Sequence, residues 1–222
     1  MTTSEQQKDV KTILPLSVFT PRAWAISVLD SPLVLLNDHA HLERKASTNA
    51  LQLLHQWPYG EPPLRWSQEL ADISRDESHH LSLVVKILQE RGGVLSQHHR
   101  NRYAQDLREC VRTGKTPDEL LDRLLISALI EARSCERFKL LAECSTDAQL
   151  RKLYHGLWSS EHDHYLVFYS LAELLVDGDT LKKRWNELLE LESEIIQKQS
   201  KNVSIHSWVE NSDDREVAAR SR

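Results

Sequence analysis

Most of the chain between residues 31 and 200 carries apolar residues at spacings of three and four, which is typical of helices that bury one face. Ser31-Pro32 predicts the start of one helix, and the "WPYGEPP" segment after Gln56 predicts its end. A second helix is expected over residues 67–91, where Gly92-Gly93 stops it. Further helices are expected over residues 116–143, 145–177 and 180–200, the last of them more polar.

The connections between these segments indicate the fold class. Only 6 glycines and 7 prolines occur in 222 residues, and no strand pattern is present, so long helices are favoured over many short strands. Residues 92–115, with a short helix expected at "RYAQDLRECV", join the second and third helices as a crossover. We therefore predict an all-α, ferritin-like four-helix bundle with an additional C-terminal helix. Residues 1–203 form this single domain in the prediction, and residues 204–222 form a polar, flexible tail.

Two of the predicted helices carry a glutamate and a histidine three residues apart on an apolar face. Glu77 and His80 occur in "SRDESHHLSLVV", and Glu161 and His164 repeat the spacing in "WSSEHDHYLVFY". Residues three apart share a helix face, so the two side chains of each pair can contact the same bound group. A single such pair is usually a surface pair, whereas two on separate long helices indicate a shared site.

The other two helices each offer one inward carboxylate. Glu43 shares its face with small and apolar neighbours, namely Leu36, His39, Ala40, Ala46, Ser47 and Ala50. Glu131 shares its face with Leu124, Ser127, Ala128, Ser134, Cys135 and Phe138. Its rival Glu136 has the more polar neighbours Leu129, Ala132, Arg133, Lys139, Leu140 and Glu143, so Glu131 is the better candidate.

Four carboxylates in apolar surroundings would repel one another and favour their protonated forms. Two divalent cations remove both problems, and oxygen-rich ligands with one imidazole each suit iron or manganese better than zinc. We therefore predict a two-metal site, and the intervals of 34 and 30 residues between carboxylates on successive helices fit two helical hairpins. The expected ligands are Glu43, Glu77, His80, Glu131, Glu161 and His164. Asp76 is expected to orient the ligand histidine of the other motif, while Tyr165 and Cys135 are expected to pack nearby.

Charge and cysteine content indicate which partners and cofactors the protein can bind and where it is located. The net charge is −5, but residues 91–115 hold six lysines and arginines against two acids. This basic connector is either a solvated loop or a contact for RNA phosphates, with candidate residues Arg100, Arg102, Arg108, Arg112 and Lys115. Lys182, Lys183 and Arg184 are an alternative docking site. The three cysteines lack a Cys-x-x-Cys pair, no apolar run is long enough to cross a membrane, and we expect a cytoplasmic protein.

Five segments carry a resemblance to a known family: "LLNDHAHLERKAS", "DESHH", "RYAQDLRECVR", "LIEARSCERFKLLA" and "SSEHDHYLVFYSLA". Over roughly residues 15–200 the chain resembles the tRNA 2-methylthio-isopentenyl-adenosine hydroxylases, which are ferritin-like non-haem di-iron monooxygenases. The resemblance implies two iron ions, O₂ as co-substrate, and hydroxylation of the isopentenyl group beside the tRNA anticodon. It assigns the ligand roles to the same six residues. The chain has no flavin, nicotinamide or iron–sulfur fingerprint, so an external electron donor such as a ferredoxin or flavin reductase is expected.

Two other classes of protein share parts of this pattern. A ferritin-like or rubrerythrin-like iron-oxidising protein would use the same ligand helices, although a rubrerythrin usually adds a four-cysteine iron site that is missing here. A helical RNA-binding adaptor that has lost its metal would keep only the basic connector. The iron content separates the three: two per chain for the hydroxylase, many for the iron-oxidising protein, and none for the adaptor.

Overall fold

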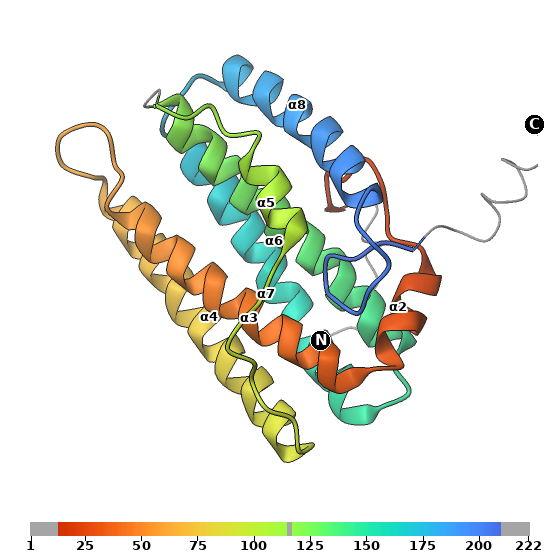
Figure 1. Ribbon diagram of the computed structural model, residues 1–222. Helices are drawn as coiled ribbons and strands as arrows, with labels where there is room; N and C mark the ends of the chain where they lie inside the picture. The colour runs from red at the N-terminus through yellow and green to blue at the C-terminus, as the bar shows by residue number, and fades with distance from the viewer. Residues whose placement is uncertain (1–12, 115–116, 210–222) are drawn as a thin grey trace, which may run out of the picture.

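Figure 1 shows the computed structural model of the chain, which describes residues 13–114 and 117–209. Seven helices lie wholly within these residues, and no strand occurs among them. They are α2 (Arg22–Leu29), α3 (Pro32–Leu54), α4 (Leu64–Glu90), α5 (Arg102–Arg108), α6 (Asp118–Cys144), α7 (Ala148–Ala172) and α8 (Gly178–Gln197). The predicted all-α class is confirmed. None of these helices is long and apolar enough to cross a membrane.

Two helical hairpins form the bundle. α3 packs along α4, α6 packs along α7, and α4 meets α7 between the hairpins (Figure 1). The crossover from α4 to α6 carries α5, which packs against α6 and α8. One apolar cluster gathers around Trp66, Leu124 and Phe168, and a second around Leu36, Val84 and Tyr154. In each of α3, α4, α6 and α7, the inner face carries residues of one apolar cluster near one end and residues of the other near the opposite end, with polar side chains between them. Both ends of the bundle interior are therefore apolar, and its middle is polar.

The ends of the helices follow local rules. Gly92 has a φ of 78°, the left-handed conformation that favours glycine, and it ends α4. Asp147 caps α7 by accepting hydrogen bonds from the backbone of Gln149 and Leu150, so this helix begins at Ala148, three residues after the predicted start. Arg91 donates to both oxygens of the same carboxylate at 2.8 and 2.9 Å. The end of α4 is thereby tied to the start of α7.

The tail predicted to begin at residue 204 is packed as far as the structure describes it, so that boundary was wrong. Ile205, Ser207 and Trp208 are buried. The guanidinium of Arg137, itself fully buried, donates to the backbone carbonyls of Ile205 and Ser207. Burying a guanidinium requires acceptors, and this segment supplies them. Residues 210–222 of the predicted tail lie outside the described residues.

A buried charged network fixes α8 to the bundle. Arg133 on α6 binds both carboxylate oxygens of Glu192 on α8 at 2.9 Å, and the hydroxyl of Tyr103 on α5 donates to the same carboxylate at 3.0 Å. Glu136 accepts from the backbone and hydroxyl of Thr20 at 2.6 and 2.7 Å and from Arg133 at 3.2 Å. Within the "EARSCERF" segment, Arg133, Glu136 and Arg137 bind neighbouring segments of the chain. Glu131 is the charged side chain of this segment that faces the bundle interior.

Candidate metal centre

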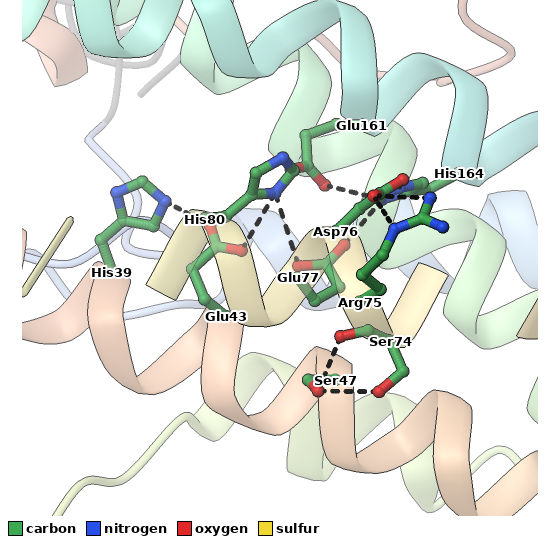
Figure 2. Close-up of polar contacts among 10 residues, drawn as sticks. All are labelled: His39, Glu43, Ser47, Ser74, Arg75, Asp76, Glu77, His80, Glu161 and His164. Carbon is green, nitrogen blue, oxygen red and sulfur yellow. Dashed lines mark hydrogen bonds and ion pairs between the residues drawn. The ribbon is translucent and has the colours of Figure 1, made fainter. Parts of the chain in front are cut away.

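The two Glu-x-x-His pairs and the two single glutamates meet in the middle of the bundle. Their ligand atoms fall into two groups, each with all atoms within 4.8 Å of one another. The first group is Glu43, Glu77, His80 and Glu161, and the second is Glu77, Glu131, Glu161 and His164. Figure 2 shows five of these six side chains, from α3, α4 and α7, turned toward one another. All six residues expected from the sequence to bind metal therefore come together in this cluster.

Helix geometry places these groups. Glu77 and His80 are one turn apart on α4, and Glu161 and His164 are one turn apart on α7. All six residues are at most 6 % exposed. Glu77 and Glu161 belong to both groups, which is the position expected of carboxylates that bridge two ions.

Both histidines present Nδ1 to the carboxylates. His80 Nδ1 lies 3.4 Å from Glu161 and 3.6 Å from Glu43, while His164 Nδ1 lies 2.6 Å from Glu77. Five buried atoms of the cluster make no well-formed hydrogen bond: Glu77 Oε1, His80 Nδ1, Glu161 Oε1, and Nδ1 and Nε2 of His164. Unpartnered buried donors and acceptors are costly. One imidazole and three carboxylates at each position therefore fit a pair of divalent cations.

The electrostatics agree with this fit. Burial and the nearby charges of Glu77 and Glu161 raise the pKa of Glu131 well above its usual range. Burial and the charge of Glu43 likewise raise the pKa of Glu77. Burial opposes protonation of His164, but its close contact with the carboxylate of Glu77 dominates and raises the pKa of the imidazole to about 9. Cations at the centre would stabilise the ionised carboxylates and replace these protons.

His39 is a functional candidate that the sequence analysis treated only as lining. Its Nε2 contacts Glu43 Oε1 (Figure 2), and its buried ring stacks on Tyr154 with centroids 5.6 Å apart. Burial would raise the pKa of Glu43, yet the interaction with His39 holds it down at about 2. Its position one turn before Glu43, on the same face, was the signal available in the sequence.

The structure places the other predicted neighbours less tightly. Asp76 Oδ2 lies 3.7 Å from His164 Nε2, which is near but longer than a hydrogen bond, and the Asp76 side chain is 40 % exposed. Arg75 donates to Asp76 at 3.1 Å. Cys135 is buried near the centre, where burial and the charge of Glu161 raise the pKa of its thiol. The rival Glu136 binds Thr20 and Arg133 instead of facing the centre.

A cavity of about 530 Å³ between α3 and α6 reaches the centre. Its inner end is lined by Glu43, Glu77, Glu131 and Glu161. Its walls include Leu42, Ala46, Ile126, Ile130 and Phe138, and its rim includes the cationic side chains Arg44, Lys45, Arg108 and Arg123. A passage with both apolar and polar walls and several cations at its rim therefore connects the cluster with the surface beside α5.

The basic connector divides among several roles. Arg108 lines the cavity that reaches the centre, whereas Arg100 and Arg102 line a second cavity. Arg112 is held by Asp122 at 2.8 and 2.9 Å, so its role is structural, and Lys115 lies outside the described residues. In the alternative docking site, Arg184 binds the same carboxylate of Asp122, whereas Lys182 and Lys183 are exposed.

Comparison with known proteins gives consistent results. A family model described as tRNA-(MS[2]IO[6]A)-hydroxylase (MiaE) matches residues 8–207. The tRNA 2-(methylsulfanyl)-N(6)-isopentenyladenosine(37) hydroxylase of Pseudomonas putida is 34% identical over 86% of this chain and 90% of its own. The protein of that name from Salmonella typhimurium is 29% identical, with 86% of each chain covered.

A solved structure shares the fold. It is described as protein 43 with aldehyde deformylating oxygenase activity from Synechococcus, and it is 32% identical with a TM-score of 0.81. The match covers 89% of this chain and 98% of that one. It supports the ferritin-like fold predicted from the sequence. With the family match spanning nearly all the described residues, this chain belongs to the tRNA-(MS[2]IO[6]A)-hydroxylase family.

Proposed function

We propose that this protein hydroxylates the isopentenyl group of N6-isopentenyladenosine, or its 2-methylthio form, next to the anticodon of tRNA. One observation supports this more than any other: a cavity with apolar side chains on its walls and cations at its rim leads to a buried cluster of four glutamates and two histidines. Such a passage suits a substrate with a phosphate backbone at one end and a hydrocarbon tail at the other.

The cavity offers a different chemistry at each depth. Leu42, Ile126 and Ile130 would surround the prenyl tail and exclude water from the reacting carbon. At the rim, burial first and the nearby charges of Arg44 and Arg108 second lower the pKa of Lys45, so three cations lie close together there. Arg44 and Arg108 have no ion-pair partner among the described residues, so both are available to RNA phosphates.

The six-residue cluster would hold two iron ions, which when bound would supply the activation of O₂. The role of this chain is to position and protect that chemistry. Glu77 and Glu161 would lie between the ions, while His39 would fix one oxygen of Glu43 and leave the other for coordination. The apolar clusters around Leu124 and Leu36 would limit entry of water from either end of the bundle.

The stoichiometry of the overall reaction requires an electron donor. One oxygen atom of O₂ enters the C–H bond, and the other leaves as water with two protons and two electrons. These electrons would come from an external donor such as a ferredoxin or a flavin reductase in the cytoplasm, where tRNA is modified.

A second candidate activity is aldehyde deformylation. The Synechococcus structure with that described activity is similar to this chain over most of its length, and an apolar cavity could admit a long-chain aldehyde. The cationic rim favours RNA, because an aldehyde has no negative charge to bind there. An iron-oxidising protein would need neither the apolar walls nor the cationic rim.

Nucleoside analysis of tRNA tests the proposal directly. Cells that make the prenylated adenosine should contain its hydroxylated form when they carry this protein and lose it when the gene is deleted. Expression of the wild-type protein should restore the nucleoside, whereas the Glu131→Ala variant should not. Unchanged nucleosides after deletion, together with conversion of an added aldehyde by the purified protein, would favour deformylation instead.

A further inference from the structure

A second cavity, of about 450 Å³, lies beside the passage to the metal centre. Three segments that are distant in the sequence line it: the first turns of α3, the connector from His99 to Tyr103, and residues 199–207. Asn101 and His206 line both cavities, so the two spaces share a wall. None of the six candidate metal ligands lines this second cavity.

His206 gives the shared wall a buried, unused hydrogen-bond donor. Asn101 Oδ1 accepts from the backbone N–H of Ala104 at 3.1 Å, which turns the amide nitrogen toward His206. That nitrogen donates to His206 Nδ1 at 3.1 Å, so the ring proton resides on Nε2. His206 is 4 % exposed, its Nε2 has no partner, and its ring is supported by Tyr103 with centroids 4.4 Å apart. The His206 ring is thus held by Asn101 and Tyr103 as a fixed part of the wall between the two cavities.

The charges of the second cavity suit a nucleotide. Arg100 is exposed and has no ion-pair partner among the described residues. The carboxylate of Asp38 is occupied, since it accepts from His99 at 2.7 Å and from the backbone of Ile205 at 2.7 Å. The remaining lining is rich in amides and hydroxyls, including Asn202 and Ser204. Such groups hydrogen-bond the edges of unstacked bases, and a free guanidinium binds phosphate.

From these observations we infer that the second cavity binds a nucleotide directly adjacent to the prenylated adenosine, with Asn202 contacting its base, Arg100 its phosphate, and the buried ring of His206 forming the wall shared with the first cavity. The inference rests on the proposed function, because it assigns the first cavity to the prenylated adenosine. It would give the enzyme a way to recognise the sequence or shape of the anticodon loop beside the residue that it modifies. Reading bases next to the target is a common source of context preference in enzymes that act on one nucleotide.

A cycle of paired substitutions in protein and RNA tests the inference. The RNA is an anticodon stem-loop with the prenylated adenosine, and it is compared with two versions that carry an abasic site on the 5′ or the 3′ side of that residue. The protein variants are Asn202→Trp, which fills the cavity from an exposed position, and Arg100→Ser. Arg65→Ser, at the exposed start of α4, is a matched control for the loss of one cation.

Wild-type protein should bind one of the abasic stem-loops at least about fivefold more weakly than the intact one, as expected for loss of a single base contact. Asn202→Trp should bind the intact stem-loop as weakly as that abasic version and should no longer distinguish the two. Arg100→Ser should lower affinity for every stem-loop, and Arg65→Ser should keep the wild-type discrimination. Equal binding of all three stem-loops by the wild-type protein would overturn the inference, and so would full discrimination by Asn202→Trp.

Activity on the free prenylated nucleoside separates this inference from the proposed function. That substrate occupies only the first cavity, so the wild-type protein and the Arg65→Ser control should hydroxylate it with the same kcat/KM, which shows that the first cavity is intact. If the wild-type protein hydroxylates the intact stem-loop but binds all three stem-loops equally, the second subsite alone is wrong. If the wild-type protein neither binds the stem-loop nor hydroxylates any prenylated adenosine, the proposed function fails and the subsite fails with it.

Discussion

Glu131 and Glu136 provide a matched pair of substitutions within one helix. Both are on α6, and both are 5 % exposed. Glu131 lies in the second ligand group, whereas Glu136 accepts hydrogen bonds from Thr20 and from the guanidinium of Arg133. Replacement of either glutamate by glutamine keeps the shape of the side chain and removes its charge. We therefore expect Glu136→Gln to lose stability but keep its metal, and Glu131→Gln to lose metal but keep its stability.

Glu136→Gln should lower the stability of the metal-free protein. The carboxylate accepts bonds of 2.6, 2.7 and 3.2 Å, and the last comes from a cation that is fully buried. Weakening a buried, charged network of this kind costs about 3 kcal/mol. For a chain of this length that corresponds to a fall in Tm of roughly 6–12 °C. Its metal content should stay at about two ions per chain.

Glu131→Gln should have the opposite profile. Burial and neighbouring carboxylates already disfavour the ionised form of Glu131, so a neutral amide should change the unfolding free energy of the metal-free protein by less than about 1 kcal/mol. Loss of a carboxylate ligand should reduce the bound metal to one ion or none.

Denaturant unfolding of metal-free protein and metal titration, performed on both variants, distinguish the two roles. Loss of metal from Glu136→Gln with retention in Glu131→Gln would refute the assignment of α6 faces. A large loss of stability in metal-free Glu131→Gln would show that this side chain has a structural role instead.

Three further predictions address the rim, the lining and the C-terminal segment. Arg44→Ser and Arg108→Ser should each weaken tRNA binding and reduce the slope of log K against log salt by roughly 0.7–0.9, as measured by salt titration, without changing the iron content; an unchanged slope would place RNA docking elsewhere. His39→Phe should keep the fold but lower metal affinity roughly 10- to 100-fold in a titration of the metal-free protein, because Glu43 loses its orienting contact; unchanged affinity would reduce His39 to packing. Burial and the charge of Arg137 hold the pKa of His206 well below 6.5, so the unfolded chain takes up a proton that the folded protein does not. The unfolding free energy should therefore decrease as pH falls below about 6.5, by up to about 1.4 kcal/mol per pH unit, and His206→Asn should flatten that decrease in denaturant titrations; an unchanged pH profile in the variant would contradict this cause.

The helices and the ligand cluster could be predicted from the sequence because their signals are local. The three-residue spacing of Glu77 and His80 fixes a shared face, and the neighbours within one or two turns were enough to prefer Glu131 over Glu136. Helix ends were predicted less well, as the start of α7 shows, since several residues near Ser145 can serve as caps.

The remaining features depend on contacts between distant segments. Residues 205–208 have the mixed sequence Ile-His-Ser-Trp within a polar C-terminal region, and they are held by contacts with Arg137 on α6 and Asp38 on α3. Nothing near them in the sequence signals those partners. Likewise, Arg112 was an equal candidate for RNA binding until the fold placed Asp122 against it. The second cavity combines three such segments, which is why it could not be predicted from the sequence.

The origin of the new oxygen atom tests the central claim most directly, namely that a metal centre in this bundle inserts oxygen from O₂ into a prenyl C–H bond. Iron-loaded protein, a prenylated anticodon stem-loop and an electron donor should be allowed to react under ¹⁸O₂ in ordinary water, and the nucleosides should be analysed by mass spectrometry. The account predicts a hydroxylated prenyl group that carries ¹⁸O. A hydroxylated product entirely without label would show that water is the oxygen source, and it would contradict the monooxygenase assignment.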